Sequence, residues 1–110
     1  MSREKIVEES IGPEDKIQKS YGGRYEGAYG IMSMSKRKLL FITEKGIFRK
    51  SYYLVLDLPY EKIKSLRTEG DYDLIIETED LKHTFKTELH VGTVEKALRE
   101  LMEQEPSQDI

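Results

Sequence analysis

The stretch that decides the fold is residues 74–102, LIIETEDLKHTFKTELHVGTVEKALRELM. Up to about Leu89, apolar residues tend to recur at every second position, which is the period of a strand with one buried face. After His90 the spacing changes to three and four, and four apolar residues would then share one face of a helix: Val91, Val94, Leu98 and Leu101. This change of period predicts a strand-rich body followed by a single amphipathic α-helix.

Local signals agree with a helix at this end of the chain. Thr93 is the predicted N-cap, because its hydroxyl can accept a hydrogen bond from an unpaired amide of the first turn. Glu95 lies near the positive end of the helix dipole and four residues before Arg99, with which it can form an ion pair. The helical pattern ends near Gln104, and residues 105–110 are predicted to form a disordered tail.

Outward from this stretch, apolar runs separated by turn residues predict seven strands. They are Lys16–Tyr21, Gly27–Met34, Arg37–Thr43, Ile47–Leu58, Ile63–Thr68, Tyr72–Thr78 and His83–Leu89. We expect Gly22-Gly23 to break the first strand, and Gly46 to take a positive φ in a hairpin loop at residues 44–46. Pro59 should end the fourth strand, because proline cannot donate to a ladder.

The fourth strand is the longest, and its alternation predicts one face that lines the core. Five residues are assigned to that face: Phe48, Tyr52, Leu54, Leu56 and Leu58. The last hairpin should direct Leu74, Ile76 and Phe85 inward.

A single meander with apolar inner faces must curl up or be covered, because an open sheet would expose much of its core. We therefore expect a mainly β (α+β) fold, in which a seven-stranded antiparallel, partly open barrel is capped by one C-terminal α-helix. The domain should span residues 14–104. An N-terminal extension, residues 1–13, precedes it and either packs on the barrel or extends from it.

Three stretches of the sequence resemble the GRAM branch of the pleckstrin-homology-like superfold. Residues 30–41, GIMSMSKRKLLF, are similar to a signature in which a glycine and a strand lead through threonine and a turn to arginine, leucine and phenylalanine. Residues 58–63, LPYEKI, resemble a later stretch with a proline before a turn and an isoleucine, and residues 74–85 resemble the final hairpin before the helix.

The sequence also departs from that pattern. Ser35 stands where threonine is usual, Lys38 where arginine is usual, and Glu79-Asp80-Leu81 replaces a frequent Asp-Gly turn. The resemblance covers roughly residues 14–104. It implies a PH-like barrel that binds phosphoinositides, peptides or partner proteins, without selecting among them.

The composition excludes several classes of protein. Because the chain has no cysteine, it has no disulfide framework, no thiolate nucleophile and no cysteine-ligated zinc. Its longest nearly uncharged apolar stretch, Ser51–Leu58, is too short to cross a bilayer, and residues 1–5 do not lead into a secretory signal. Cytoplasm is the expected location. Abundant Glu and Lys without asparagine fit a thermophilic source.

Charge is distributed unevenly along the chain. Residues 36–67 contain nine basic and three acidic residues, whereas residues 68–110 contain four basic and twelve acidic ones. The basic part predicts a surface for phosphate or an acidic partner, with these candidate ligand-binding residues: Lys36, Arg37, Lys38, Arg49, Lys50, Lys64 and Arg67. The alternative is a solvated shell whose oppositely charged halves attract each other.

The predicted function is that of a non-enzymatic binding or adaptor module for a protein or peptide partner, engaged by an edge strand or the groove beside the helix. The pair Tyr52-Tyr53 on the long fourth strand and the absence of a polar catalytic cluster motivate this hypothesis. The alternative is weak electrostatic recruitment to an anionic membrane lipid or polyphosphate through the basic strands 36–67. With only Lys19 and Arg24 near the first hairpin loop, a specific phosphoinositide site is disfavoured. The net charge of −3 disfavours nucleic acid, and the oligomeric state stays open.

No catalytic residue, metal site or cofactor is predicted. His83 and His90 lack the spacing of a helical metal pair, and both are expected at the surface or rim. Asp71 and Asp73 are expected to cap a turn, because no EF-hand loop follows them.

Overall fold

The computed structural model describes residues 2–104 of the chain. In chain order its elements are α1 (Arg3–Ile11), β1 (Ile17–Tyr25), β2 (Ala28–Ser35), β3 (Lys38–Lys45), β4 (Ser51–Pro59), the 3-10 helix η1 (Tyr60–Lys62), β5 (Ser65–Glu69), β6 (Asp73–Glu77), β7 (Lys82–Thr87) and α2 (Val91–Glu103). The predicted tail, residues 105–110, lies outside the described residues.

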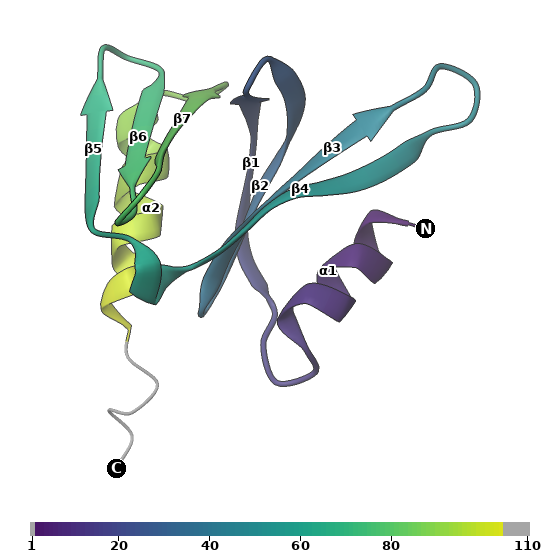
Figure 1. Cartoon of the computed structure of the whole chain (residues 1–110), viewed down its shortest axis with the longest axis horizontal. Coiled ribbons are helices and arrows are strands. Elements are labelled where there is room, and N and C mark those ends of the chain that lie inside the picture. The colour runs from purple at the N-terminus through teal and green to yellow at the C-terminus, as the bar shows by residue number, and fades with distance from the viewer. Residues whose placement is uncertain (1, 105–110) are drawn as a thin grey trace.

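The seven strands form one antiparallel sheet in the order β4-β3-β2-β1-β7-β6-β5. β1 connects its two halves, because it pairs along its length with β2 but only through Gly23–Tyr25 with β7. The end strands β4 and β5 do not pair with each other, so the barrel-like sheet stays partly open between them. Figure 1 shows β5, β6 and β7 grouped in front of α2, with β1–β4 at an angle to them. The predicted fold class is confirmed.

The core lies between the two halves of the sheet and α2. Three aromatic rings form its centre, with centroids 4.7 Å apart for Tyr25 and Phe85 and 5.6 Å apart for Tyr25 and Phe41. The predicted inward residues Leu74, Ile76 and Phe85 are fully buried. The apolar face of α2 closes the core, and it consists of the residues predicted from the spacing by three and four: Val91, Val94, Leu98 and Leu101.

The first strand is not broken at Gly22-Gly23, contrary to the prediction, and β1 continues to Tyr25. A Cβ on Gly23 would lie 2.6 Å from the carbonyl oxygen of Lys86, so the missing side chain allows β7 to approach. The chain turns instead at Glu26 and Gly27, where φ is 53° and 83°. These two positive values are typical of a tight hairpin turn.

The prediction that one face of the fourth strand carries five core residues is also wrong. A register shift lies between the pairs Phe41↔Leu56 and Ile42↔Leu54, so Val55 is an extra residue in β4. Such a bulge changes which face the following side chains occupy. Leu56 and Leu58 therefore contribute to the core, whereas Leu54 is exposed on the outer side.

The N-terminal extension packs on the sheet as a helix. α1 begins after Ser2, whose hydroxyl accepts a hydrogen bond from the amide of Lys5. It lies against β3 and β4, and Figure 1 shows it across these strands from α2. Its Ile6 is buried, and the outward-facing Leu40 and Ile42 of β3 are buried too. α1 thus covers an apolar outer face that would otherwise be solvated.

The helix α2 begins three residues earlier than the predicted cap implies. His90, not Thr93, is the N-cap: its Nδ1 accepts a hydrogen bond of 3.0 Å from the amide of Gly92. The predicted pair within the helix is confirmed, with 3.1 Å between Arg99 Nη2 and Glu95 Oε2.

Candidate functional site

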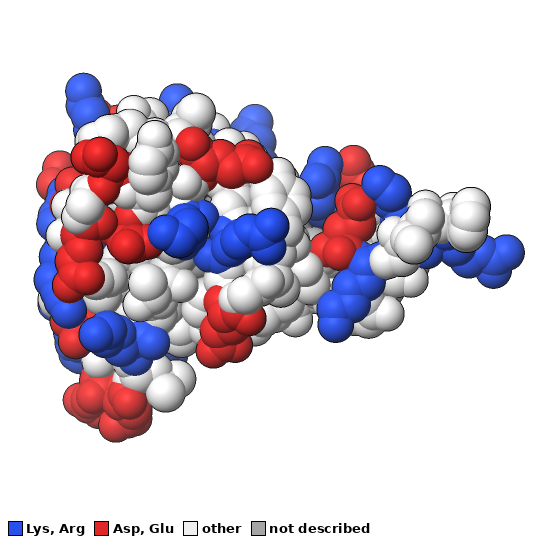
Figure 2. Space-filling model, turned by 90° about the horizontal axis from the view of Figure 1, so that it is seen from above, with Lys and Arg blue, Asp and Glu red and all other residues white. Residues whose placement is uncertain are grey.

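The most exposed apolar side chains of the described residues lie at the end of the β3–β4 hairpin. We call residues 44–53 the arm. It extends beyond the rest of the sheet, and both Figure 1 and Figure 2 show it projecting from the body. Ile47 and Phe48 occupy its tip and are 86% and 100% exposed. Neither side chain contributes to the folded core, so the arm carries apolar surface that is in contact with solvent in the folded chain.

The loop at the tip depends on a glycine. It spans residues 46–50, later than the predicted 44–46, because β3 continues to Lys45 and β4 begins at Ser51. Gly46 has the predicted positive φ, 107°, and a Cβ there would collide with the backbone carbonyl of Arg49. The loop therefore closes tightly on itself, which holds Ile47 and Phe48 away from the strands.

Basic side chains surround this apolar tip. Lys45, Arg49 and Lys50 are exposed, against one carboxylate, Glu44, within the arm. Lys50 Nζ lies 2.9 Å from Glu44 Oε2. The hydrogen bond between them lowers the pKa of Glu44 and raises the pKa of Lys50, so both stay charged at neutral pH. Lys45 Nζ lies 5.5 Å from the ring centroid of Tyr53, a cation–π contact.

The seven basic residues predicted from the sequence do not form one surface. Lys36, Arg37 and Lys38 lie at the start of β3, and Arg49 and Lys50 lie beyond its other end. Because β3 has eight residues, roughly 23 Å separates these two groups. Lys64 and Arg67 lie in or next to β5, at the far end of the sheet order. Only Arg49 and Lys50 belong to the arm.

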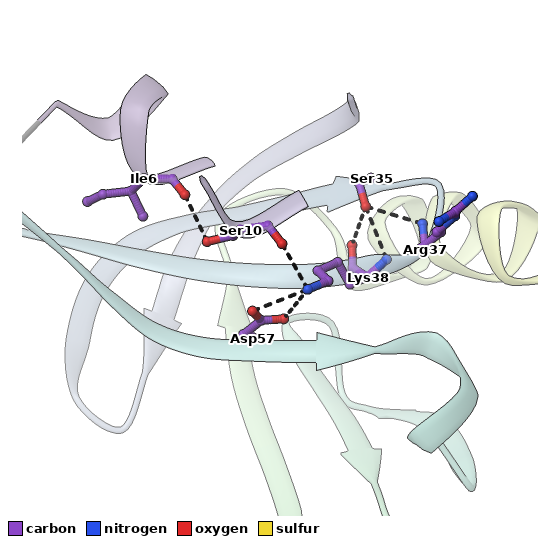
Figure 3. A network of polar contacts seen from close by, with 6 residues as sticks. All are labelled: Ile6, Ser10, Ser35, Arg37, Lys38 and Asp57. Atoms are coloured by element: carbon purple, nitrogen blue, oxygen red, sulfur yellow. Dashed lines mark hydrogen bonds and ion pairs between the residues drawn. The ribbon is translucent and has the colours of Figure 1, made fainter. Parts of the chain in front are cut away.

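Lys38 has a structural role. Its Nζ lies 3.0 Å from Asp57 Oδ1 and donates a 3.0 Å hydrogen bond to the carbonyl oxygen of Ser10 (Figure 3). Ser35 Oγ accepts hydrogen bonds from the amides of Arg37 and Lys38, which shapes the β2–β3 turn. The Lys38 side chain thus connects β3 with β4 and with the end of α1. Its positive charge is balanced by the carboxylate of Asp57.

His83 is largely buried on the inner face of β7, not exposed at the surface. It is 6% exposed, and its Nδ1 lies 2.8 Å from the hydroxyl oxygen of Tyr25. Burial lowers the pKa of His83, so the imidazole is neutral at neutral pH. The expectation of a rim position was wrong because the alternation of β7 directs His83, Phe85 and Thr87 inward together.

The remaining candidates have structural positions. His90 caps α2, and its Nε2 lies 3.5 Å from Asp71 Oδ1. Within residues 2–104, no three His, Asp or Glu side chains are arranged to hold a metal ion.

The sequence contained a signal for the arm that the strand pattern obscured. In Gly46-Ile47-Phe48-Arg49-Lys50, two apolar residues stand between a glycine and two cations. Alternation assigned Phe48 to the core and would leave only Ile47 on the outer face. A turn at these residues instead exposes both side chains.

No helix among the described residues has the length and apolar character needed to cross a bilayer. A scan against models of known protein families finds no match for this chain, and a search of curated proteins finds no similar sequence.

Proposed function

We propose that this protein is a non-enzymatic module that docks reversibly on anionic membrane surfaces through its arm. The observation that carries the proposal is the tip, where two highly exposed apolar side chains are flanked by Lys45, Arg49 and Lys50. Apolar side chains enter the interfacial region of a bilayer, while cations beside them attract anionic headgroups. A narrow projecting arm can reach a flat surface without obstruction from the body.

The magnitudes indicate weak binding. Burial of Ile47 and Phe48 contributes about 2 kcal/mol each, and each basic residue near an anionic surface contributes about 1 kcal/mol. With Glu44 offsetting one cation, the apolar part contributes about 4 kcal/mol and the electrostatic part about 2 kcal/mol. Loss of either the tip residues or the anionic lipid should therefore weaken binding measurably.

We also propose that this module belongs to the PH-like superfold, as a GRAM-type domain. Seven antiparallel strands followed by a C-terminal helix are the order that the resemblance implies. A phosphoinositide headgroup site would use cations of the first hairpin loop, between β1 and β2. The cations of the arm belong instead to the β3–β4 hairpin.

Vesicle co-sedimentation tests the proposal. The full chain is mixed with phosphatidylcholine vesicles that contain or lack phosphatidylserine, at low and high salt. We expect binding only to the anionic vesicles, with a strong decrease in high salt because screening weakens the attraction. The double variant Ile47→Ser/Phe48→Ser should lose at least tenfold in affinity.

A matched control separates the arm from general surface hydrophobicity. Leu89 is also exposed, at 52%, but lies between β7 and α2, far along the chain from the arm. Leu89→Ser should bind vesicles like the unmodified chain. The proposal would be contradicted by equal binding to neutral and anionic vesicles, or by undiminished binding of the double variant. It would also be contradicted if the arm bound a protein and no vesicle.

A further inference from the structure

A second candidate site, independent of the arm, lies where the sheet is open. Between the second half of β4 and the β6–β7 turn is a cavity of about 440 Å³, which we call the seam groove. Leu56 and Leu58 provide apolar lining from β4, Glu79 and Asp80 lie on the turn, and His83 lies on β7. The groove therefore combines a strand edge, an apolar lining and a polar ring.

His83 presents one nitrogen that the fold does not use. Its Nδ1 is paired with Tyr25, and no hydrogen bond to its Nε2 is formed within residues 2–104. No fully buried polar side-chain atom in that part of the chain lacks a partner, so Nε2 keeps a small accessible area although the residue is 94% buried. Because His83 lines the seam groove, Nε2 is available to a ligand there.

The groove is bordered by a strand edge without a partner. β4 pairs only with β3, and no other backbone hydrogen bond from residues 51–58 is formed within the described chain. Unpaired amide and carbonyl groups of an edge strand are a template for another strand. An extended peptide alternates donors and acceptors, so it can satisfy Nε2 of His83 in either tautomer as well as the β4 edge.

The charge of the rim indicates which peptide fits. Glu61, Glu79 and Asp80 line the groove and form no ion pair with a described cation, whereas Asp57 is balanced by Lys38. Lys62 and Lys64 offset part of this charge. The consecutive carboxylates of the turn favour a basic side chain opposite them.

We propose that the seam groove binds an extended peptide segment of another protein, which adds to the free edge of β4, places apolar side chains over Leu56 and Leu58, and directs a basic residue toward Glu79 and Asp80. His83 acts as a polar contact to the peptide backbone. The groove would make the protein an adaptor with two separate binding surfaces.

A displayed library of random peptides as long as β4, nine residues, is panned against the full chain. The most enriched peptide is synthesised and titrated by calorimetry, and its contacts are mapped by amide chemical shifts. We expect enriched sequences with alternating apolar residues and a Lys or Arg, and shift changes in β4, in residues 78–81 and at His83. N-methylation of the peptide amides that face β4 should weaken binding at least tenfold.

Two variants make the test specific. Glu79→Lys/Asp80→Lys changes only exposed turn residues and should weaken the peptide about tenfold, or about 1.4 kcal/mol. The arm variant Phe48→Ser should bind the peptide unchanged, so this result does not depend on membrane docking. The proposal is overturned if no peptide is enriched, if the shifts map outside the seam groove, if N-methylation has no effect, or if β4 is instead protected by a second copy of the chain.

Discussion

The three phenylalanines of the chain lie in two contrasting environments: Phe41 on β3 and Phe85 on β7 belong to the aromatic core, and Phe48 lies at the arm tip. Phe41 and Phe85 are fully buried around Tyr25, whereas Phe48 is fully exposed. Burial of the first two stabilises the fold by removing apolar area from water. The third contributes no such stabilisation, and under the proposed function its ring enters the membrane interface instead.

The largest expected effect is in the core. Phe85→Ala removes a ring that contacts both Tyr25 and Phe41, and leaves a cavity, so we expect a loss of about 3–5 kcal/mol in the free energy of unfolding. Urea unfolding followed by circular dichroism measures this loss. A variant that stays within about 1 kcal/mol of the unmodified chain would mean that the core repacks, and would break the contrast with the arm.

A smaller effect is expected where α1 covers the outer face of the sheet. Ile6→Ala should lower the free energy of unfolding by about 2 kcal/mol, because Ile6 is the buried residue of this helix. Amide hydrogen exchange at Leu40 and Ile42 should become faster in the same variant. Glu9→Ala, on the exposed side of α1, is the control and should change neither measurement. Unaltered exchange in Ile6→Ala would show that α1 does not protect the sheet.

The third effect depends on pH and concerns the buried pair of Tyr25 and His83. Burial depresses the pKa of folded His83 below its ordinary value of 6.5, so the unfolded chain binds a proton more readily. Stability from the neutral imidazole is therefore present above about pH 6.5 and is lost as pH falls toward and through the folded pKa.

Urea unfolding at about pH 7.5 and about pH 5.5 tests this direction. The double variant Tyr25→Phe/His83→Phe removes the titrating ring without leaving a buried hydroxyl unpaired, and it should lose less stability on acidification. An identical loss in both proteins would assign the pH dependence to other groups.

The smallest effect on stability should come from the arm. Phe48→Ser should change the free energy of unfolding by less than about 0.5 kcal/mol, because the ring contacts water in the folded state. The same denaturant titration that detects Phe85→Ala measures it. A loss above about 1 kcal/mol would show that Phe48 packs in solution, and would remove the basis for membrane docking.

The periods of the sequence determined much of the fold. Spacing by three and four located α2 and its buried face, and alternation located seven strands and the inward Leu74, Ile76 and Phe85. These predictions hold because an uninterrupted element has one geometry, so the apolar pattern alone says which side chains share a face.

Only the tertiary structure decided the features that depend on a neighbouring strand. The extra residue Val55 is visible only from the pairing of β4 with β3, and Gly22-Gly23 stays in β1 because β7 approaches there. The position of His83 beside Tyr25 depends likewise on a contact between residues far apart in the sequence. A periodic pattern defines faces within one strand, whereas pairing between strands decides which face meets the core, and that pairing is a property of the whole sheet.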